Sequence, residues 1–343
     1  MKHFVEIAQE WGNRLTLNIN DDVVQRAVAQ NPWFTASEIS LAISAITAQM
    51  LQPVRLTEWL SRYSLYSHHT QHSHHSQHND TSRRTPQRTL IVMAGNLPLV
   101  GFFDLLCVVA AGDVALVKPS HKDRVLVEWA ISELRAIAPD IPIYIYSDGE
   151  PIDRLIATGS DKTRAHFEAS YPTTPKLLRG TRHSLAIITD RDSDQSIRLL
   201  QEDIFGYSGL GCRSVSKIFL PEEFGVERLP TGSVHPKHRN NYLRLRALLK
   251  LGGVEFVDSG THCLVASTDF PSEIAQLSIQ RYTSLDEVKQ WIAEKDEAIQ
   301  CIVASSETIS HPRRASFGEA QHPTLFDYAD GVDTMKFLLS NLR

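Results

Sequence analysis

Apolar positions along the chain change from helix-like to strand-like spacing near residue 89. In the segment before that point, Thr35 lies three residues ahead of Glu38, a pattern typical of a helix N-terminus. Apolar residues then recur at near-helical spacing: Ile39, Ile43, Ile46, Leu51, Leu56, Trp59, Leu60 and Tyr63. The pattern predicts a helical N-terminal segment over residues 1–66.

From residue 89 short apolar runs alternate with longer amphipathic ones. The predicted strands are 89–93, 114–118, 142–147, 154–158 and 184–189. The predicted helices are 99–111, 122–137 and 161–170. This βαβ rhythm predicts a parallel sheet with helices on both faces.

Past Ser184 a second α/β region follows, with a strand at 215–220, a helix at 241–250 and another helix starting at Ser284. We expect the first α/β region to span 89–182 and the second to span 183–310. A tail, 311–343, is expected to pack back on the first region.

Residues 67–88 interrupt the pattern, with six histidines between His68 and His78 among Ser, Gln and Thr. Such a polar tract has little apolar surface to bury, which predicts a linker. No Cys or fixed carboxylate accompanies the histidines, so we assign no metal site. An interaction protein acting through the tract is the alternative.

Composition narrows the class of protein. The chain has 343 residues, 42% of them hydrophobic, and a formal net charge of -5, which gives no electrostatic reason to expect nucleic acid as a partner. The four cysteines (107, 212, 263 and 301) show no metal-ligand spacing or disulfide framework and fit a reducing compartment. No segment is apolar and long enough to span a bilayer, and we expect a cytoplasmic protein.

Cys212 is the candidate nucleophile. It ends the run Gly206-Tyr207-Ser208-Gly209-Leu210-Gly211, where a substrate can approach the backbone closely. A thiol is an effective nucleophile near neutral pH, and Arg213 supplies a neighbouring cation. A buried structural cysteine is the alternative interpretation.

Two further segments carry polar groups at predicted strand ends. Asn96 lies in a turn between the strand 89–93 and an apolar helix, where its amide can donate to an oxyanion or satisfy only its own backbone. Lys118 and Ser120 close the strand 114–118, at the edge of an α/β sheet where ligands bind. A solvated lysine is the alternative there.

In this order, the segments resemble the aldehyde dehydrogenase superfamily. The closest likeness is to LuxC-type acyl-CoA reductases, the fatty-acid reductases of bacterial luminescence. It rests on three segments: Gly95 to Gly101, Glu202 to Ser214 and Asp327 to Met335. The resemblance also matches Gly159 and Ser160 to a turn beside the cofactor phosphates.

The resemblance implies an aldehyde dehydrogenase fold with a cofactor-binding domain at 89–182 and a catalytic domain at 183–310. It implies reduction of acyl-CoA, or another acyl thioester, to an aldehyde, with NADPH or alternatively NADH as cofactor. Cys212 would be the nucleophile and Asn96 the oxyanion donor. Lys118, Ser120, Gly159 and Ser160 would bind the cofactor. We expect a homo-oligomer, and an acyl-donating partner enzyme is compatible with this reaction.

One departure from the superfamily pattern concerns water. Where aldehyde-oxidising members carry a Glu that activates water, this chain has Leu178, which cannot act as a base. His183 lies nearby in sequence and is a candidate proton carrier. This favours acyl transfer to or from a thiol. The alternatives are an NAD-dependent aldehyde dehydrogenase and an acyltransferase without productive cofactor binding.

Overall fold

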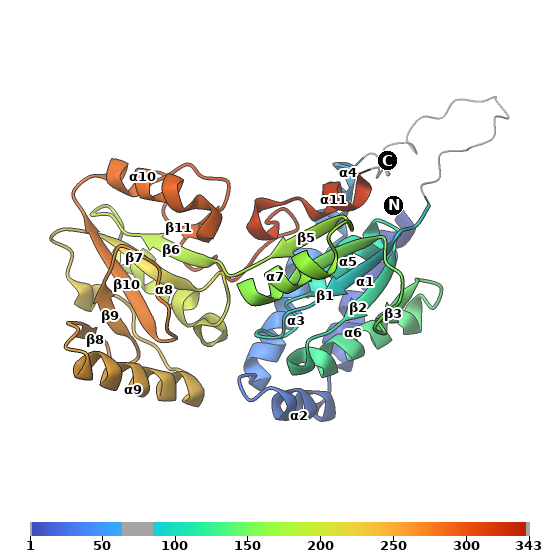
Figure 1. Ribbon diagram of the computed structural model, residues 1–343, viewed down its shortest axis with the longest axis horizontal. Coiled ribbons are helices and arrows are strands. Elements are labelled where there is room, and N and C mark those ends of the chain that lie inside the picture. Colours follow the sequence, from blue (N-terminus) through green and yellow to red (C-terminus); the bar gives the residue numbers. More distant parts are fainter. Residues whose placement is uncertain (1, 64–84, 341–343) are drawn as a thin grey trace. The chain divides into compact units, whose positions relative to one another are not determined.

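The computed structural model of the protein describes residues 2–63 and 85–340 (Figure 1). The chain divides into two units. Unit 1 holds the described residues of Met1–Gly180, Thr324–Tyr328 and Val332–Arg343, and unit 2 holds Thr181–Pro323 and Ala329–Gly331. The N-terminal segment and the first α/β region therefore share one unit, and the tail is divided between the two. Of the predicted linker 67–88, residues 67–84, which include the six histidines, lie outside the described residues, and Arg88 already belongs to the first strand.

The sheet of unit 1 is wholly parallel, with strand order β3-β2-β1-β4-β5. Its strands are β1 (Arg88–Val92), β2 (Val114–Lys118), β3 (Ile143–Ile145), β4 (Arg154–Thr158) and β5 (Lys176–Arg179). The central strands are buried on both faces, which explains their continuous apolar runs.

Helices cover both faces of this sheet (Figure 1). One face packs on α5 (Phe102–Ala110) and α6 (Arg124–Ile137), and the other on α7 (Asp161–Ser170) through Phe167. The first face also carries α1 (Lys2–Asn18), α2 (Asp21–Gln30), α3 (Ala36–Met50), α4 (Pro53–Ser61) and α11 (Thr334–Leu339). The predicted capping box of Thr35 and Glu38 begins α3.

The strand order of unit 1 creates a switch point between β1 and β4. The chain leaves β1 for α5 on one face, whereas it leaves the neighbouring β4 for α7 on the opposite face. Connections that diverge in this way leave a crevice at the carboxyl edge of the sheet, where α/β proteins bind ligands.

The sheet of unit 2 has the order β12-β11-β6-β7-β10-β9-β8 and is parallel except for the pair β8 and β9. Its strands are β6 (His183–Ile187), β7 (Val215–Pro221), β8 (Val257–Asp258), β9 (Cys263–Ala266), β10 (Gln276–Tyr282), β11 (Ile299–Val303) and β12 (Arg314–Ala315).

Unit 2 is also covered on both faces. One face packs on α8 (Asp194–Phe205) and the other on α10 (Leu285–Lys295), while α9 (Pro236–Leu251) packs beside β9. Short 3-10 segments are η2 (His121–Asp123), η3 (Gly206–Gly209), η4 (Val226–Arg228), η5 (Asp296–Ala298) and η6 (Ala329–Gly331). No helix within 2–63 and 85–340 is both long and apolar enough to cross a membrane.

The last tail residues are tied into unit 1 by polar contacts. Tyr328 accepts a hydrogen bond from the indole nitrogen of Trp59 at 2.6 Å, and its hydroxyl also meets that of Tyr63. The buried guanidinium of Arg154 donates to the carbonyls of Leu338 and Ser340. These contacts fix the end of the chain against the sheet and α4.

Lys217 is a buried charge in the core of unit 2. Its side chain extends from β7 with 0% of its surface exposed, and Nζ donates to the carbonyl of Ser267 at 2.8 Å. The ammonium lies 5.0 Å from the ring centroid of Phe219 and 4.9 Å from that of Trp291. Burial lowers the pKa of Lys217 to about 8, because the charged form loses hydration there.

Lys217 should make stability depend on pH above neutrality. Between about pH 8 and pH 10.5 the folded lysine has lost a proton that the unfolded one keeps. The free energy of unfolding should therefore rise with pH in this window, by roughly 1–3 kcal/mol relative to Lys217→Met. Urea unfolding of both proteins across the window measures this. A difference that stays constant with pH contradicts a titrating Lys217.

Candidate functional site

Cys212 follows a sharply bent segment of unit 2. After α8 ends at Phe205, Tyr207 and Ser208 adopt left-handed φ angles of 49° and 59°, and Gly209 follows at 70°. Left-handed conformations at non-glycine residues are strained and concentrate at functional sites. The Cys212 side chain is exposed, whereas Cys107, Cys263 and Cys301 are buried. The bend thus presents one thiol to solvent.

Buried polar contacts hold the segment around this bend. The Asp203 carboxylate, at 0% exposure, accepts the backbone N–H groups of Gly318 at 2.7 Å and Ala320 at 2.9 Å. Gln321 donates to the hydroxyl of Ser214 at 3.3 Å. Burial raises the pKa of Asp203 to about 6, although the two N–H groups act in the opposite direction. The tail segment 318–321 therefore supports residues 206–214, which we call the thiol loop.

Hydrogen bonds to backbone carbonyls hold the chain at Cys212. Ser184 Oγ donates to the Cys212 carbonyl at 2.8 Å, and Arg213 donates to the carbonyl of Ala320 at 3.3 Å. The expected cation beside Cys212 thus also binds the tail backbone.

His183 lies at the same sheet edge as Cys212. It is the first residue of β6, and the next residue, Ser184, pairs with Val215 at the start of β7. Its ring stacks on Phe270 at 4.7 Å, and Nδ1 lies 3.4 Å from the hydroxyl of Ser216. The structure therefore brings His183 and the Cys212 loop to the amino edge of adjacent strands.

Asn96 lies in unit 1, exposed in the turn between β1 and α5. Asn31 donates to the carbonyl of Gly95 at 3.0 Å. Leu99 adopts a left-handed φ of 55°, and its N–H donates to the Asp123 carboxylate at 2.8 Å. Asp123 is buried, which raises the pKa of this carboxyl well above its usual range. The Asn96 turn is thus held at Gly95 and at Leu99.

Lys118 and Ser120 lie at the carboxyl end of β2. Lys118 Nζ pairs with the exposed carboxylate of Asp148 at 2.6 Å, and the lysine side chain is itself partly exposed. Ser120 Oγ accepts the N–H of Lys122 at 3.3 Å. A Cβ at position 95 would come within 2.6 Å of the Ser120 Cβ, so only glycine fits where these two loops meet.

Gly159 and Ser160 connect β4 to α7. Ser160 caps α7 by accepting the N–H of Thr163 at 3.3 Å, and Gly159 donates to the carbonyl of Arg179 at 3.1 Å. With the Asn96 turn they flank the switch point between β1 and β4. Leu178 is half-buried on β5 among apolar residues of the α7 face, with no carboxylate at its position.

Four supporting residues were not predicted: Asp203, Asp123 and Asp148, described above, and His238, whose ring lies 3.2 Å from the carbonyl of Ser208. The burial of Asp203 and Asp123 follows only from the fold. Asp148 is 30 residues from Lys118 in the chain. No local sequence pattern indicated these partners. Within the described parts of the chain, no group of three or more His, Cys, Asp or Glu side chains is arranged to hold a metal ion.

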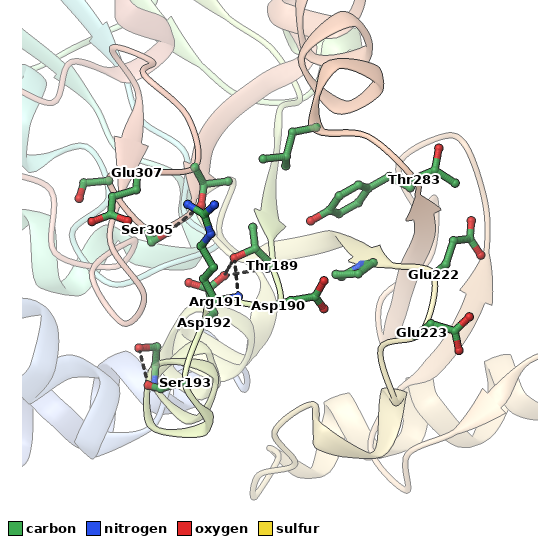
Figure 2. A pocket seen from close by; sticks show the side chains of 16 residues that line it. Thr189, Asp190, Arg191, Asp192, Ser193, Glu222, Glu223, Thr283, Ser305 and Glu307 are labelled. Carbon is green, nitrogen blue, oxygen red and sulfur yellow. Dashed lines mark hydrogen bonds between the residues drawn. The ribbon is translucent and has the colours of Figure 1, made fainter.

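A cavity of about 790 Å³ lies at the opposite, carboxyl edge of the unit 2 sheet (Figure 2). Figure 2 shows the carboxylates of Glu222 and Glu223 on one side and Glu307 on the other, with Arg191 between them. Tyr282 contributes from the end of β10. None of the predicted site residues lines this cavity, and its acidic walls alone identify no ligand.

Comparisons with known proteins support the fold. The sequence matches no protein-family model and no curated protein. Solved structures do match. A putative aldehyde dehydrogenase from Burkholderia cenocepacia has a TM-score of 0.61 at 16% identity, over 88% of this chain and 73% of that one. Aldehyde dehydrogenase 21 from Physcomitrella patens, solved with its product succinate, has a TM-score of 0.63 at 14% identity, over 88% and 72%.

A third neighbour is an NAD-dependent benzaldehyde dehydrogenase from Corynebacterium glutamicum, with a TM-score of 0.60 at 14% identity over 88% of this chain and 75% of that one. At such identities the likeness shows the fold. The predicted aldehyde dehydrogenase-like α/β fold, with helices at its N-terminus, is confirmed.

Because Cys212 is the exposed cysteine, we expect alkylating reagents to modify it selectively. Iodoacetamide at pH 8 should modify Cys212 in the native protein at least tenfold faster than the buried cysteines, because alkylation requires contact with the sulfur. Burial also raises the pKa of Cys107, and raises that of Cys263 to about 11. Peptide mapping of time points gives the rates. Equal labelling of all four cysteines in folded protein contradicts the expected exposure.

Proposed function

We propose that this chain is an acyl-thioester reductase that forms an aldehyde through an acyl group carried on Cys212. The observation that carries the proposal is the exposed Cys212 thiol on a strained bend, in a chain with an aldehyde dehydrogenase-like fold. Strained residues cluster at functional sites, and covalent catalysis needs a nucleophile that the substrate can reach.

The proposed reaction has two steps, acylation of Cys212 and reduction of the resulting thioester. The Cys212 thiolate attacks the thioester carbonyl carbon, the bond to the carrier thiol breaks, and the carrier leaves as a thiol after taking a proton. A reduced nicotinamide dinucleotide bound at the unit 1 sheet edge would supply a hydride to the carbonyl carbon of the Cys212 thioester. The product on Cys212 would be the oxyanion of a thiohemiacetal, and the dinucleotide would be left oxidised. The bond between carbon and Cys212 sulfur then breaks, which releases the aldehyde and restores the thiolate.

We assign the oxyanion to Asn96 and proton transfer to His183. The Asn96 side chain is exposed in a turn whose backbone is held at Gly95 by Asn31 and at Leu99 by Asp123. A preorganised donor stabilises the negative oxygen that forms on each attack. His183 lies at the sheet edge of the Cys212 loop, and an imidazole can both accept and donate a proton.

The cofactor is assigned to the carboxyl edge of the unit 1 sheet. Lys118, Ser120, Gly159 and Ser160 flank the switch point there, and the paired Lys118 and Asp148 offer a donor and an acceptor for ribose hydroxyls. We propose NADPH, as the family resemblance implies. NADH is the alternative that Asp148 favours, because its carboxylate repels a 2′-phosphate.

Leu178 favours thiol chemistry over hydrolysis. Its side chain packs against the apolar cluster beneath α7, and no carboxylate replaces the water-activating Glu at that position. Without a base an acyl-enzyme loses its acyl group to water slowly. Oxidation of an aldehyde to an acid is the second candidate. The names of the structural neighbours favour it, whereas Leu178 opposes it. A homo-oligomer and an acyl-donating partner enzyme remain part of the proposal.

The reaction is tested with acyl-CoAs from short to long chain. The wild type should oxidise NADPH or NADH in step with aldehyde formation, and Cys212→Ser should lose this activity by at least 10³-fold because its nucleophile is far weaker. Cys301→Ala, which removes a buried thiol, is the matched control and should stay within a few-fold. Aldehyde oxidation with no acyl-CoA reduction would favour the second candidate instead.

Asn96 is tested by truncation. Asn96→Ala should lower kcat for acyl-CoA reduction by about 10²–10³-fold, the usual cost of one oxyanion donor, with little change in the Kd of the dinucleotide. Stopped-flow single turnovers and fluorescence titration separate the two quantities. Weakened dinucleotide binding with an intact single-turnover rate would make Asn96 a cofactor residue.

A further inference from the structure

His238 joins two backbone carbonyls beneath the Cys212 loop. It lies on α9, 2% exposed, with Nδ1 3.2 Å from the carbonyl of Ser208 and Nε2 3.2 Å from that of Thr261. The ring of His262 approaches it edge-on at 4.6 Å. One imidazole thus spans the strained bend and the loop that leads into β9.

The Ser208 carbonyl belongs to the middle of the left-handed bend. Each such non-glycine residue costs about 1–3 kcal/mol and persists only where its surroundings hold it. Ser208 is buried, so its carbonyl needs a protein donor. Thr261 is half-buried and lies closer to solvent, where water can replace a lost hydrogen bond.

The two acceptors compete for His238. A neutral imidazole carries one N–H, so it donates to one carbonyl at a time. Burial, with His235 nearby, lowers the pKa of His238, and burial lowers that of the adjacent His262 to about 3. Burial thus favours the uncharged ring of His238, although the two carbonyls act in the opposite direction. In that uncharged ring, the tautomer determines which carbonyl receives a hydrogen bond.

We propose that His238 is the positioning residue of the thiol loop: its Nδ1–H donates to the Ser208 carbonyl, holds the left-handed bend and so sets the position of Cys212. The consequence for catalysis rests on the proposed function. The contact between His238 and the bend does not, since it is a property of unit 2 alone.

Two matched substitutions separate the two hydrogen bonds. The amide nitrogen of Asn is as many bonds from Cβ as Nδ1 of His, and that of Gln as many as Nε2. His238→Asn therefore keeps a donor toward Ser208, whereas His238→Gln keeps one toward Thr261. His262→Leu is the control, because it changes the buried ring that packs against His238 and leaves the His238 imidazole in place.

The readout is the pH profile of Cys212 alkylation by iodoacetamide, with thermal unfolding as a check on folding. We expect His238→Asn and His262→Leu to stay within about twofold of the wild-type rate at every pH. His238→Gln should change the rate at least fivefold, because an unheld bend alters the surroundings of the thiol. Equal effects of Asn and Gln, or no effect of either, would overturn the proposal.

A second measurement uses only the wild-type protein and therefore does not depend on whether a variant folds. Long-range ¹H–¹⁵N spectra of the histidine-labelled wild type at pH 7 distinguish imidazole tautomers, and the proposal requires the Nδ1–H form at His238. An Nε2–H tautomer would overturn it. Neither measurement uses an acyl substrate. A wild type that fails to reduce acyl-CoA would therefore contradict the proposed function without affecting the test of His238.

Discussion

Three consecutive residues at positive φ, Tyr207 to Gly209, are the constraint on which the thiol loop depends. Two of them are not glycine, so the backbone conformation is unfavourable in isolation and must be imposed by contacts. Asp203 supplies one set by binding the tail segment that packs beside the loop. The core of unit 2 thus stabilises a loop that the local sequence alone would not adopt.

In unit 1, contacts with buried side chains likewise hold a strained segment, the turn that contains Asn96. Its strand order places the Asn96 turn and the Gly159–Ser160 turn on either side of one switch point, and parallel strands bring Lys118 to the same edge. The turn is strained at Leu99 and is held by the buried Asp123. In both units a buried carboxylate accepts backbone N–H groups beside such a segment: Asp203 accepts two, and Asp123 accepts one.

The sequence predicted the parts that depend on local patterns. Helix 161–170 was predicted at its observed limits, because Ser160 caps a clear start. The helix predicted over 99–111 begins only at Phe102, since Leu99 is left-handed. β5 was not predicted, because its four residues carry a charge at each end. The partners of Asp203 and His238 are distant in the chain and follow only from the packing.

Acyl transfer to one sulfur is the central step of the proposed reaction, and mass spectrometry tests it most directly. Wild-type protein mixed with acyl-CoA in the absence of a reductant should gain the mass of a single acyl group. Peptide mapping should place that group on Cys212, and later addition of NADPH or NADH should discharge it as aldehyde. An adduct on another residue, or a protein that gains no acyl mass while it still reduces acyl-CoA, would contradict the account.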